Sequence, residues 1–165
     1  MSVRKDYRQG KNQRAARNGD QVRVLTAPAD AERAERLREV LDGLIEINRA
    51  VPIIVEGKRD ASALQCLGFE GEIIILHRGQ NLYDFSEQML ESYGKMVLLL
   101  DWDEKGDQMT RALEESLKGH FEEFRFFRDT IRILCQKDIK DIEAIPTLLR
   151  RLEGIAGKSA PGPDF

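Results

Sequence analysis

Residues 96–103 read Met-Val-Leu-Leu-Leu-Asp-Trp-Asp, and residues 52–57 read Pro-Ile-Ile-Val-Glu-Gly. In each stretch a short apolar run ends directly in a carboxylate side chain. A continuous apolar run is typical of a strand that is buried on both faces, as in a parallel sheet. Ligands bind at the carboxyl ends of such strands. The sequence therefore predicts that Glu56, Asp101 and Asp103 gather at one edge of a sheet.

Strand and helix signals alternate along the chain, which is the pattern of an α/β protein with right-handed crossovers. We predict a four-stranded, mainly parallel sheet, Rossmann-like in its arrangement, with helices on both faces. The region 121–127 fits either a helix extension or a loop. The expected strands are 52–55, 72–76, 96–100 and 130–135, and the expected helices are 30–49, 60–67, 81–92, 107–118 and 141–152.

The chain divides into three parts. Residues 1–28 show no apolar periodicity and are predicted to form a basic, flexible arm that ends at Pro28. Residues 29–152 are predicted to form the folded domain, which begins with an amphipathic helix whose apolar stripe covers the sheet. Residues 153–165 are predicted to be a flexible tail.

Composition limits the class of protein. The chain has 165 residues, of which 41% are hydrophobic and 33% charged, as in an ordinary single domain. Two cysteines are too few for a disulfide framework or a zinc cluster. The longest apolar runs fall far short of the ~20 residues that a membrane helix needs. We therefore expect a cytoplasmic protein with no membrane association.

Basic residues concentrate in the arm. Residues 1–25 carry a net charge of +5, whereas the whole chain carries −3. A basic arm ahead of an acidic domain is a nucleic-acid-binding pattern, and a solvated tail that only aids solubility explains the charge equally well. The candidate nucleic-acid-binding residues are Arg4, Lys5, Arg8, Lys11, Arg14 and Arg17.

The three predicted acids need a counter-charge. Carboxylates that share one crevice repel one another unless a cation lies between them. Oxygen ligands of this kind suit a hard divalent ion, so we expect one or two Mg²⁺ ions held by Glu56, Asp101 and Asp103, with Mn²⁺ as a substitute. Phosphate chemistry follows from such a metal.

Neighbouring residues are candidates to support the site. Gly57 would let the backbone turn sharply beside a ligand, and Lys58 could hold a phosphate or simply face solvent. Asp60 could support Glu56, approach the metal, or cap the helix that follows it. Helix capping is also the alternative role for Glu56 and Asp103.

The two acidic motifs carry a resemblance to a known family. Glu56-Gly57 follows the first predicted strand and Asp101-Trp102-Asp103 follows the third. This order and strand context resemble the Toprim domain of DNA primases, topoisomerases, RecR-like repair proteins, OLD-family nucleases and the ribonuclease M5 group. Two motifs at this spacing are far more specific than either alone.

Further positions extend the resemblance. Asp60 and Leu64 continue the form Glu-Gly-x-x-Asp-x-x-x-Leu, and Gly106 completes Asp-x-Asp-x-x-Gly. The similarity covers roughly residues 51–135 and is nearest in style to small stand-alone Toprim proteins of archaea and bacteria and to the ribonuclease M5 group.

The resemblance implies magnesium-dependent chemistry on nucleic-acid phosphodiesters. It implies that Glu56 acts as general acid or base and that Asp101 and Asp103 bind Mg²⁺. A small chain with a basic arm suits endonucleolytic cleavage of structured RNA best, with a protein partner as a candidate source of substrate recognition. The rival reading is a non-catalytic nucleic-acid-binding or assembly module that keeps the metal site, so enzymatic activity stays open at this point.

Overall fold

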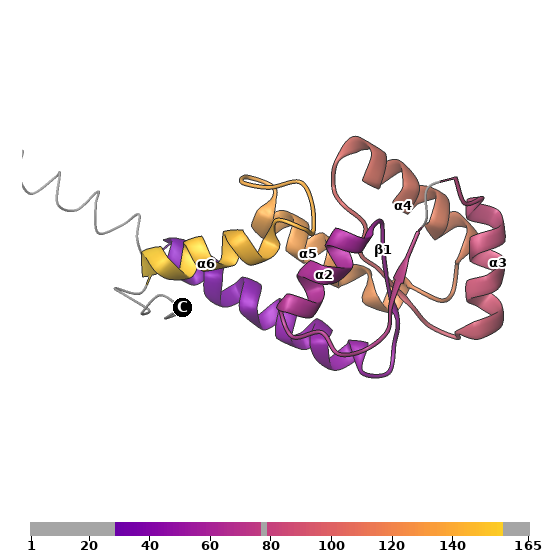
Figure 1. The fold of residues 1–165 in the computed structure, drawn as a ribbon, viewed down its shortest axis with the longest axis horizontal. Helices are drawn as coiled ribbons and strands as arrows, with labels where there is room; N and C mark the ends of the chain where they lie inside the picture. Colours follow the sequence, from indigo (N-terminus) through magenta and orange to yellow (C-terminus); the bar gives the residue numbers. More distant parts are fainter. Residues whose placement is uncertain (1–28, 77–78, 157–165) are drawn as a thin grey trace, which may run out of the picture.

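The computed structural model describes residues 29–76 and 79–156 and has an α/β fold built on a short parallel sheet (Figure 1). The strands are β1 (Ile53–Val55), β2 (Ile73–Ile75) and β3 (Val97–Leu98), in the order β2-β1-β3. Both pairings are parallel, and Ile54 of the central strand is in register with Ile74 and Leu98. The predicted fold class is confirmed, with three strands rather than four in the described part.

Helices surround the sheet. A long helix occupies residues 29–48, at the start of the described chain. The helices that follow are α2 (Lys58–Cys66), α3 (Leu82–Ser92), α4 (Glu104–Ser116), the 3₁₀ turn η1 (Glu122–Phe124), α5 (Arg125–Cys135) and α6 (Ile145–Ala156).

Each face of the sheet has its own apolar core. Ile53 and Val55 belong to one buried cluster, which also contains residues of the helix 29–48, α2, α5 and α6. Ile54 lies in the other cluster, together with residues of α3 and α4. This alternation is the period of two that a strand imposes on its side chains, and it places helices on both faces, as predicted.

The predicted fourth strand, 130–135, is wrong: this segment is the second half of α5. Burial along the segment falls on Phe124, Arg128, Ile131 and Cys135, at the three- and four-residue spacing of a helix face. An arginine occupies one position of that buried stripe and interrupts the apolar pattern that indicates a helix in the sequence. The β-branched Thr130 and Ile131 then suggested a strand, and tertiary packing overrides that preference.

The last helix also differs from its prediction. It begins at Ile145 rather than 141 and continues to Ala156, so residues 153–156 are helical and do not belong to the predicted tail. Pro146 lies in the first turn, where a missing backbone N–H breaks no hydrogen bond of the helix. Within the described ranges, no helix is both long and apolar enough to cross a membrane. The predicted arm and its six candidate basic residues lie outside those ranges.

Candidate functional site

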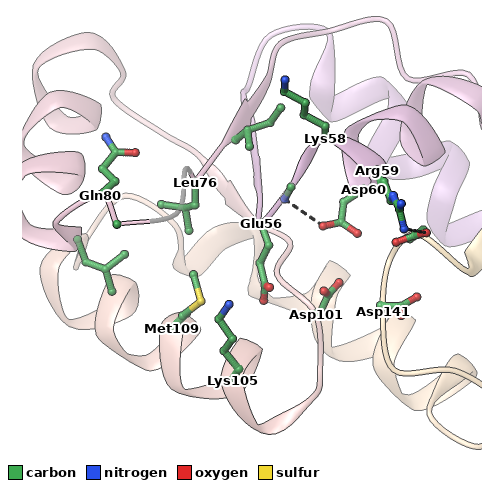
Figure 2. A pocket seen from close by; sticks show the side chains of 15 residues that line it. Glu56, Lys58, Arg59, Asp60, Leu76, Gln80, Asp101, Lys105, Met109 and Asp141 are labelled. Atoms are coloured by element: carbon green, nitrogen blue, oxygen red, sulfur yellow. Dashed lines mark hydrogen bonds and ion pairs between the residues drawn. The ribbon is translucent and has the colours of Figure 1, made fainter.

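A pocket of about 760 Å³ opens where β1 ends, and acidic side chains from three separate segments line it (Figure 2). Glu56 follows β1 directly, and Asp60 lies in the first turn of α2. Asp101 follows the apolar run that contains β3, and Asp141 and Glu143 lie before α6. The predicted meeting of Glu56 and Asp101 at the carboxyl edge of the sheet is what the structure shows.

One oxygen of the Glu56 carboxylate is buried without a partner among the described residues. Within the described residues its Oε1 atom is buried and accepts no hydrogen bond. Burial is the main reason that its pKa is raised, and the negative charge of Asp103 raises it further, while Lys105 acts in the opposite direction. A buried oxygen without a donor is unfavourable unless a cation or a proton satisfies it.

Asp101 is the most perturbed acid of the pocket. Only 8% of the residue is exposed, and its Oδ1 atom accepts a hydrogen bond of 2.9 Å from the backbone N–H of Ile142. Burial raises its pKa to about 7, and the charges of Asp60 and Glu56 add to this against the opposing hydrogen bond. A carboxyl group with such a pKa is a candidate site residue on physical grounds.

Asp60 takes part in the N-terminal turn of α2 and also lines the pocket. Its Oδ2 atom accepts a hydrogen bond of 3.1 Å from the backbone N–H of Gly57, which fixes the first turn of α2. The same carboxylate is buried in the pocket, and that burial raises its pKa. The chain bends at Gly57 between β1 and α2, but the φ of −145° is extended backbone that any residue adopts, so the bend does not require glycine.

Asp103 is placed differently from Asp101. Its Oδ1 atom accepts a hydrogen bond of 2.7 Å from Gly106 N–H and caps α4, and the residue does not line the pocket. The chain bends after Asp101 instead of staying extended, so the two carboxylates do not share one direction as expected. Asp103 nevertheless lies close enough to raise the pKa of Glu56.

Gly106 allows the acidic loop to pack closely on α4. A Cβ atom at this position would collide with the backbone carbonyl oxygen of Asp101 and would lie 2.9 Å from Oε1 of Glu56. Only glycine permits this approach. The predicted support role of Gly106 thus has a physical basis: the missing side chain leaves room for the Asp101 backbone and the Glu56 carboxylate.

Arg128 is a residue that sequence reasoning missed. It is 7% exposed and donates to the carbonyl oxygens of Leu100 and Asp101, at 2.9 and 2.6 Å, and to Oδ1 of Asp107 at 2.9 Å. The guanidinium group of Arg128, on α5, therefore fixes the backbone that places Asp101 in the pocket. A buried helical stripe containing an arginine would have been the signal, had 125–135 been interpreted as a helix.

The loop before α6 was also missed as part of the site. Trp102 donates its backbone N–H to Lys140 O at 3.0 Å and its indole N–H to Ile139 O at 2.7 Å. These bonds join the acidic loop to a segment far away in the sequence and bring Asp141 to the pocket. No local motif marks Asp141, so the sequence held no signal for it.

Three cationic side chains border the acids. Lys58 and Lys105 line the pocket, and Figure 2 shows Lys105 beside Glu56. Arg59 pairs with Glu143 at 3.6 Å across the pocket wall. The acidic centre thus has positive groups at its margin, where an anionic ligand could be held.

The donor set fits a hard divalent cation, with a restriction. The buried, unpartnered oxygen of Glu56 and the raised pKa of Asp101 are both expected where a positive ion belongs. Within the described ranges, however, no three His, Cys, Asp or Glu side chains converge closely enough to form a ready cage. Mg²⁺ tolerates this, because it commonly keeps several waters and takes only one or two protein carboxylates.

Comparison with known proteins defines the class. The sequence profile of the Toprim-like family matches residues 53–143, more than half of the chain and every acid of the pocket. The chain belongs to the Toprim-like family. Toprim domains generally bind divalent metal ions such as Mg²⁺ and act in metal-dependent chemistry related to nucleic acids.

Particular relatives are small archaeal proteins. The chain is 38% identical to a UPF0292 protein of Methanosarcina barkeri, over 73% of this chain and 85% of that one. It is 36% identical to a UPF0292 protein of Thermococcus onnurineus, over 80% of this chain and 97% of that one. A solved structure of a putative protein from Aquifex aeolicus matches with a TM-score of 0.50 and 29% identity, covering 64% of this chain and 94% of that chain.

Proposed function

We propose that this protein catalyses Mg²⁺-dependent cleavage of phosphodiester bonds in nucleic acid, and that structured RNA is its substrate. The observation that carries the proposal is the Glu56 carboxylate, which lines the same pocket as Asp101 and whose buried Oε1 atom has no partner in the described part of the chain. Membership of the Toprim-like family supports the metal and the general chemistry.

Glu56 and Asp101 are the residues that would hold the metal. When bound, Mg²⁺ supplies charge to stabilise a phosphodiester undergoing attack. Asp101 is oriented for this by the hydrogen bond from Ile142 and by the bonds of Arg128 to the backbone around it. Asp103 would act indirectly, because it caps α4 and its negative charge raises the pKa of Glu56.

Glu56 is also the candidate proton-transfer group. Burial raises its pKa above the ordinary value, so in the absence of metal the carboxyl group holds a proton more readily. It stands at the end of β1, whereas Asp101 and Asp103 follow β3, so it approaches a bound phosphate from another side. Lys58 and Lys105 would orient the substrate phosphates from the pocket margin.

A second candidate function is a nucleic-acid-binding or assembly module that keeps the metal for structure. The favouring observation is that the acids of the described chain form no closed three-ligand cage and that Asp103 serves as a helix cap. A structural site can tolerate such looseness, because it does not have to align a reacting group.

The deciding experiment compares cleavage by the wild type and by Glu56→Gln. Hairpin RNA, duplex RNA and duplex DNA are incubated with Mg²⁺, with Mn²⁺ and with a chelator. We expect metal-dependent cleavage of the structured RNA and a loss of at least about 10²-fold in Glu56→Gln, because glutamine cannot transfer a proton. Nucleic-acid binding should survive, since it depends on basic groups elsewhere.

The matched control is Glu70→Gln, the same change at an exposed position outside the pocket. It should keep the wild-type rate. Absence of cleavage of all three substrates by the wild type with either metal would favour the binding module. Full activity of Glu56→Gln would remove Glu56 as the proton-transfer group and turn attention to Asp60.

A further inference from the structure

The pocket has a second half that the acidic centre does not use. Figure 2 shows Asp101 and Asp141 on one side of Glu56, and Leu76, Gln80 and Met109 on the other. Ile75 and Leu82 line the pocket as well, so aliphatic and thioether groups form a substantial part of its lining. A single phosphate and its metal would not need apolar walls.

The size of the pocket supports a larger ligand. Its volume of about 760 Å³ is in the range of sites that enclose whole organic ligands. Leu76 is only 5% exposed, while Leu82 and Met109 are half-buried, so the wall is formed by the core and keeps an accessible surface. Such a wall suits the apolar face of a flat ring.

One amide group stands at this wall. Gln80 lines the pocket, and among the described residues its Oε1 atom is buried without a hydrogen-bond partner. A covered carbonyl oxygen without a donor is unfavourable. If the side chain rotates so that this oxygen faces the pocket, the amide offers one acceptor and two donor hydrogens to a ring edge.

We infer that the apolar half of the pocket is a nucleobase subsite, in which Leu76 and Met109 contact the face of one base and the Gln80 amide reads its edge. The inference rests on the proposed function, because it takes the base to belong to a nucleotide whose phosphate occupies the acidic half. The amide of glutamine pairs best with adenine, accepting from the N6 amino group and donating to N7. The subsite therefore favours adenine over uracil.

The test uses mononucleotides and needs no catalysis. The chain has four methionines, so methyl-labelled protein gives few signals, and Met109 is the one that lines the pocket. AMP, UMP and ribose 5-phosphate are titrated in the presence of Mg²⁺. We expect AMP to shift the Met109 methyl signal and to bind on the order of tenfold more tightly than ribose 5-phosphate, which lacks a base.

Met96 is the internal control, because it is buried in the core away from this pocket and from Gln80. Its signal should stay in place. We expect AMP to bind at least about fivefold more tightly than UMP. Gln80→Leu should abolish this preference, whereas Gln65→Leu, an exposed glutamine of α2, should retain it.

Equal affinity for AMP and ribose 5-phosphate, or no measurable binding of either at millimolar concentration, overturns the subsite. An AMP preference that survives in Gln80→Leu also overturns it as stated. These outcomes are separable from the fate of the proposed function. If the protein cleaves RNA but binds ribose 5-phosphate and AMP with equal affinity, the proposed function stands and the subsite is wrong. If the protein cleaves no substrate but binds AMP through Gln80, the subsite stands and the proposed function is wrong.

Discussion

Asp101 connects stability and function at the scale of a single residue. Burial and the charges of Asp60 and Glu56 raise its pKa from 3.8 to about 7. At a pH between these two pKa values, Asp101 is therefore protonated in the folded protein and ionised in the unfolded chain. The stability that this proton contributes is complete below the unfolded pKa and is lost as the pH rises through about 7.

Without metal, the wild type should thus be less stable at about pH 8 than at about pH 5. Asp101→Asn keeps an oxygen for the Ile142 N–H and cannot ionise, so it should remove this part of the pH dependence. We expect the variant to exceed the wild type at about pH 8 by on the order of 2–4 kcal/mol in free energy of unfolding, measured by urea titration with chelator.

The control is Asp129→Asn, the same change at an exposed position of α5. It should leave the pH dependence unaltered. A wild-type slope that persists in Asp101→Asn would show that another group carries the proton.

Gly106 and Gly57 form a matched pair at the same scale. A methyl group at Gly106 would meet the Asp101 carbonyl and the Glu56 carboxylate, whereas at Gly57 it would find only Asp60 Oδ2 at an ordinary 3.7 Å. We expect Gly106→Ala to lower the free energy of unfolding by about 1–3 kcal/mol through overpacking, and Gly57→Ala to stay within about 1 kcal/mol of the wild type. Thermal melts of both variants provide the comparison. Equal effects of the two substitutions would contradict the close packing seen at Gly106.

At the scale of elements, α5 supports the site from the face of the sheet that carries Ile53 and Val55. Its single buried arginine, Arg128, joins the helix to the carbonyl groups of Leu100 and Asp101 and to the side chain of Asp107. Arg132, one turn further along, reaches only Asp107, at 3.3 Å, and is 40% exposed. Replacing each arginine by lysine therefore compares the same substitution at a buried position and at a partly exposed one.

Arg128→Lys should lower the free energy of unfolding by about 2–4 kcal/mol, because a single ammonium nitrogen cannot occupy the positions of both Nε and Nη2 and leaves buried oxygens unpaired. Arg132→Lys should change it by no more than about 0.5 kcal/mol, as expected of a partly exposed pair. Chemical denaturation measures both. If the two lysine variants were equally stable, the proposed anchoring of the Asp101 backbone by α5 would be wrong.

At the scale of the whole molecule, a cation should couple the segments that meet at the pocket. Glu56, Asp101 and Asp141 come from segments that are distant in sequence. A ligand present at about 100 times its dissociation constant adds about 2.7 kcal/mol to folding stability. Melting curves with and without millimolar Mg²⁺ should therefore differ for the wild type, and Asp101→Asn should show a smaller difference. Superimposable wild-type curves would argue against a metal site at those concentrations.

The basic arm gives a second prediction for the whole chain. If residues 1–28 contact phosphates, the affinity for nucleic acid should fall steeply with salt, with a logarithmic slope near −0.7 per contact on single strands. Replacing Arg4, Lys5, Arg8, Lys11, Arg14 and Arg17 by glutamine keeps the length of the arm and should flatten the slope. Fluorescence anisotropy at several salt concentrations measures it, and an unchanged slope would leave the arm as a solubility tail.

The sequence by itself determined the parallel α/β fold, the family and the meeting of Glu56 with Asp101. These features depend on local patterns: apolar runs of strand length, each ending in a carboxylate, and helices with clear apolar stripes. Such patterns favour the same secondary structure whichever segments pack against them. Gly106 belongs here too, because its place in a short motif made it a candidate before its packing was known.

Only the tertiary structure decided which other residues form the site. Asp141 reaches the pocket because Trp102 bonds to Ile139 and Lys140, a contact between distant segments that no local spacing encodes. Segment 125–135 is a helix because its buried face includes Arg128, whose charge is satisfied by carbonyl groups of the strand end. Asp103 became a helix cap because the chain bends directly after Asp101. For Asp141 and Arg128 the deciding energy comes from pairing polar groups across the fold, and a sequence does not show which polar groups will be buried together.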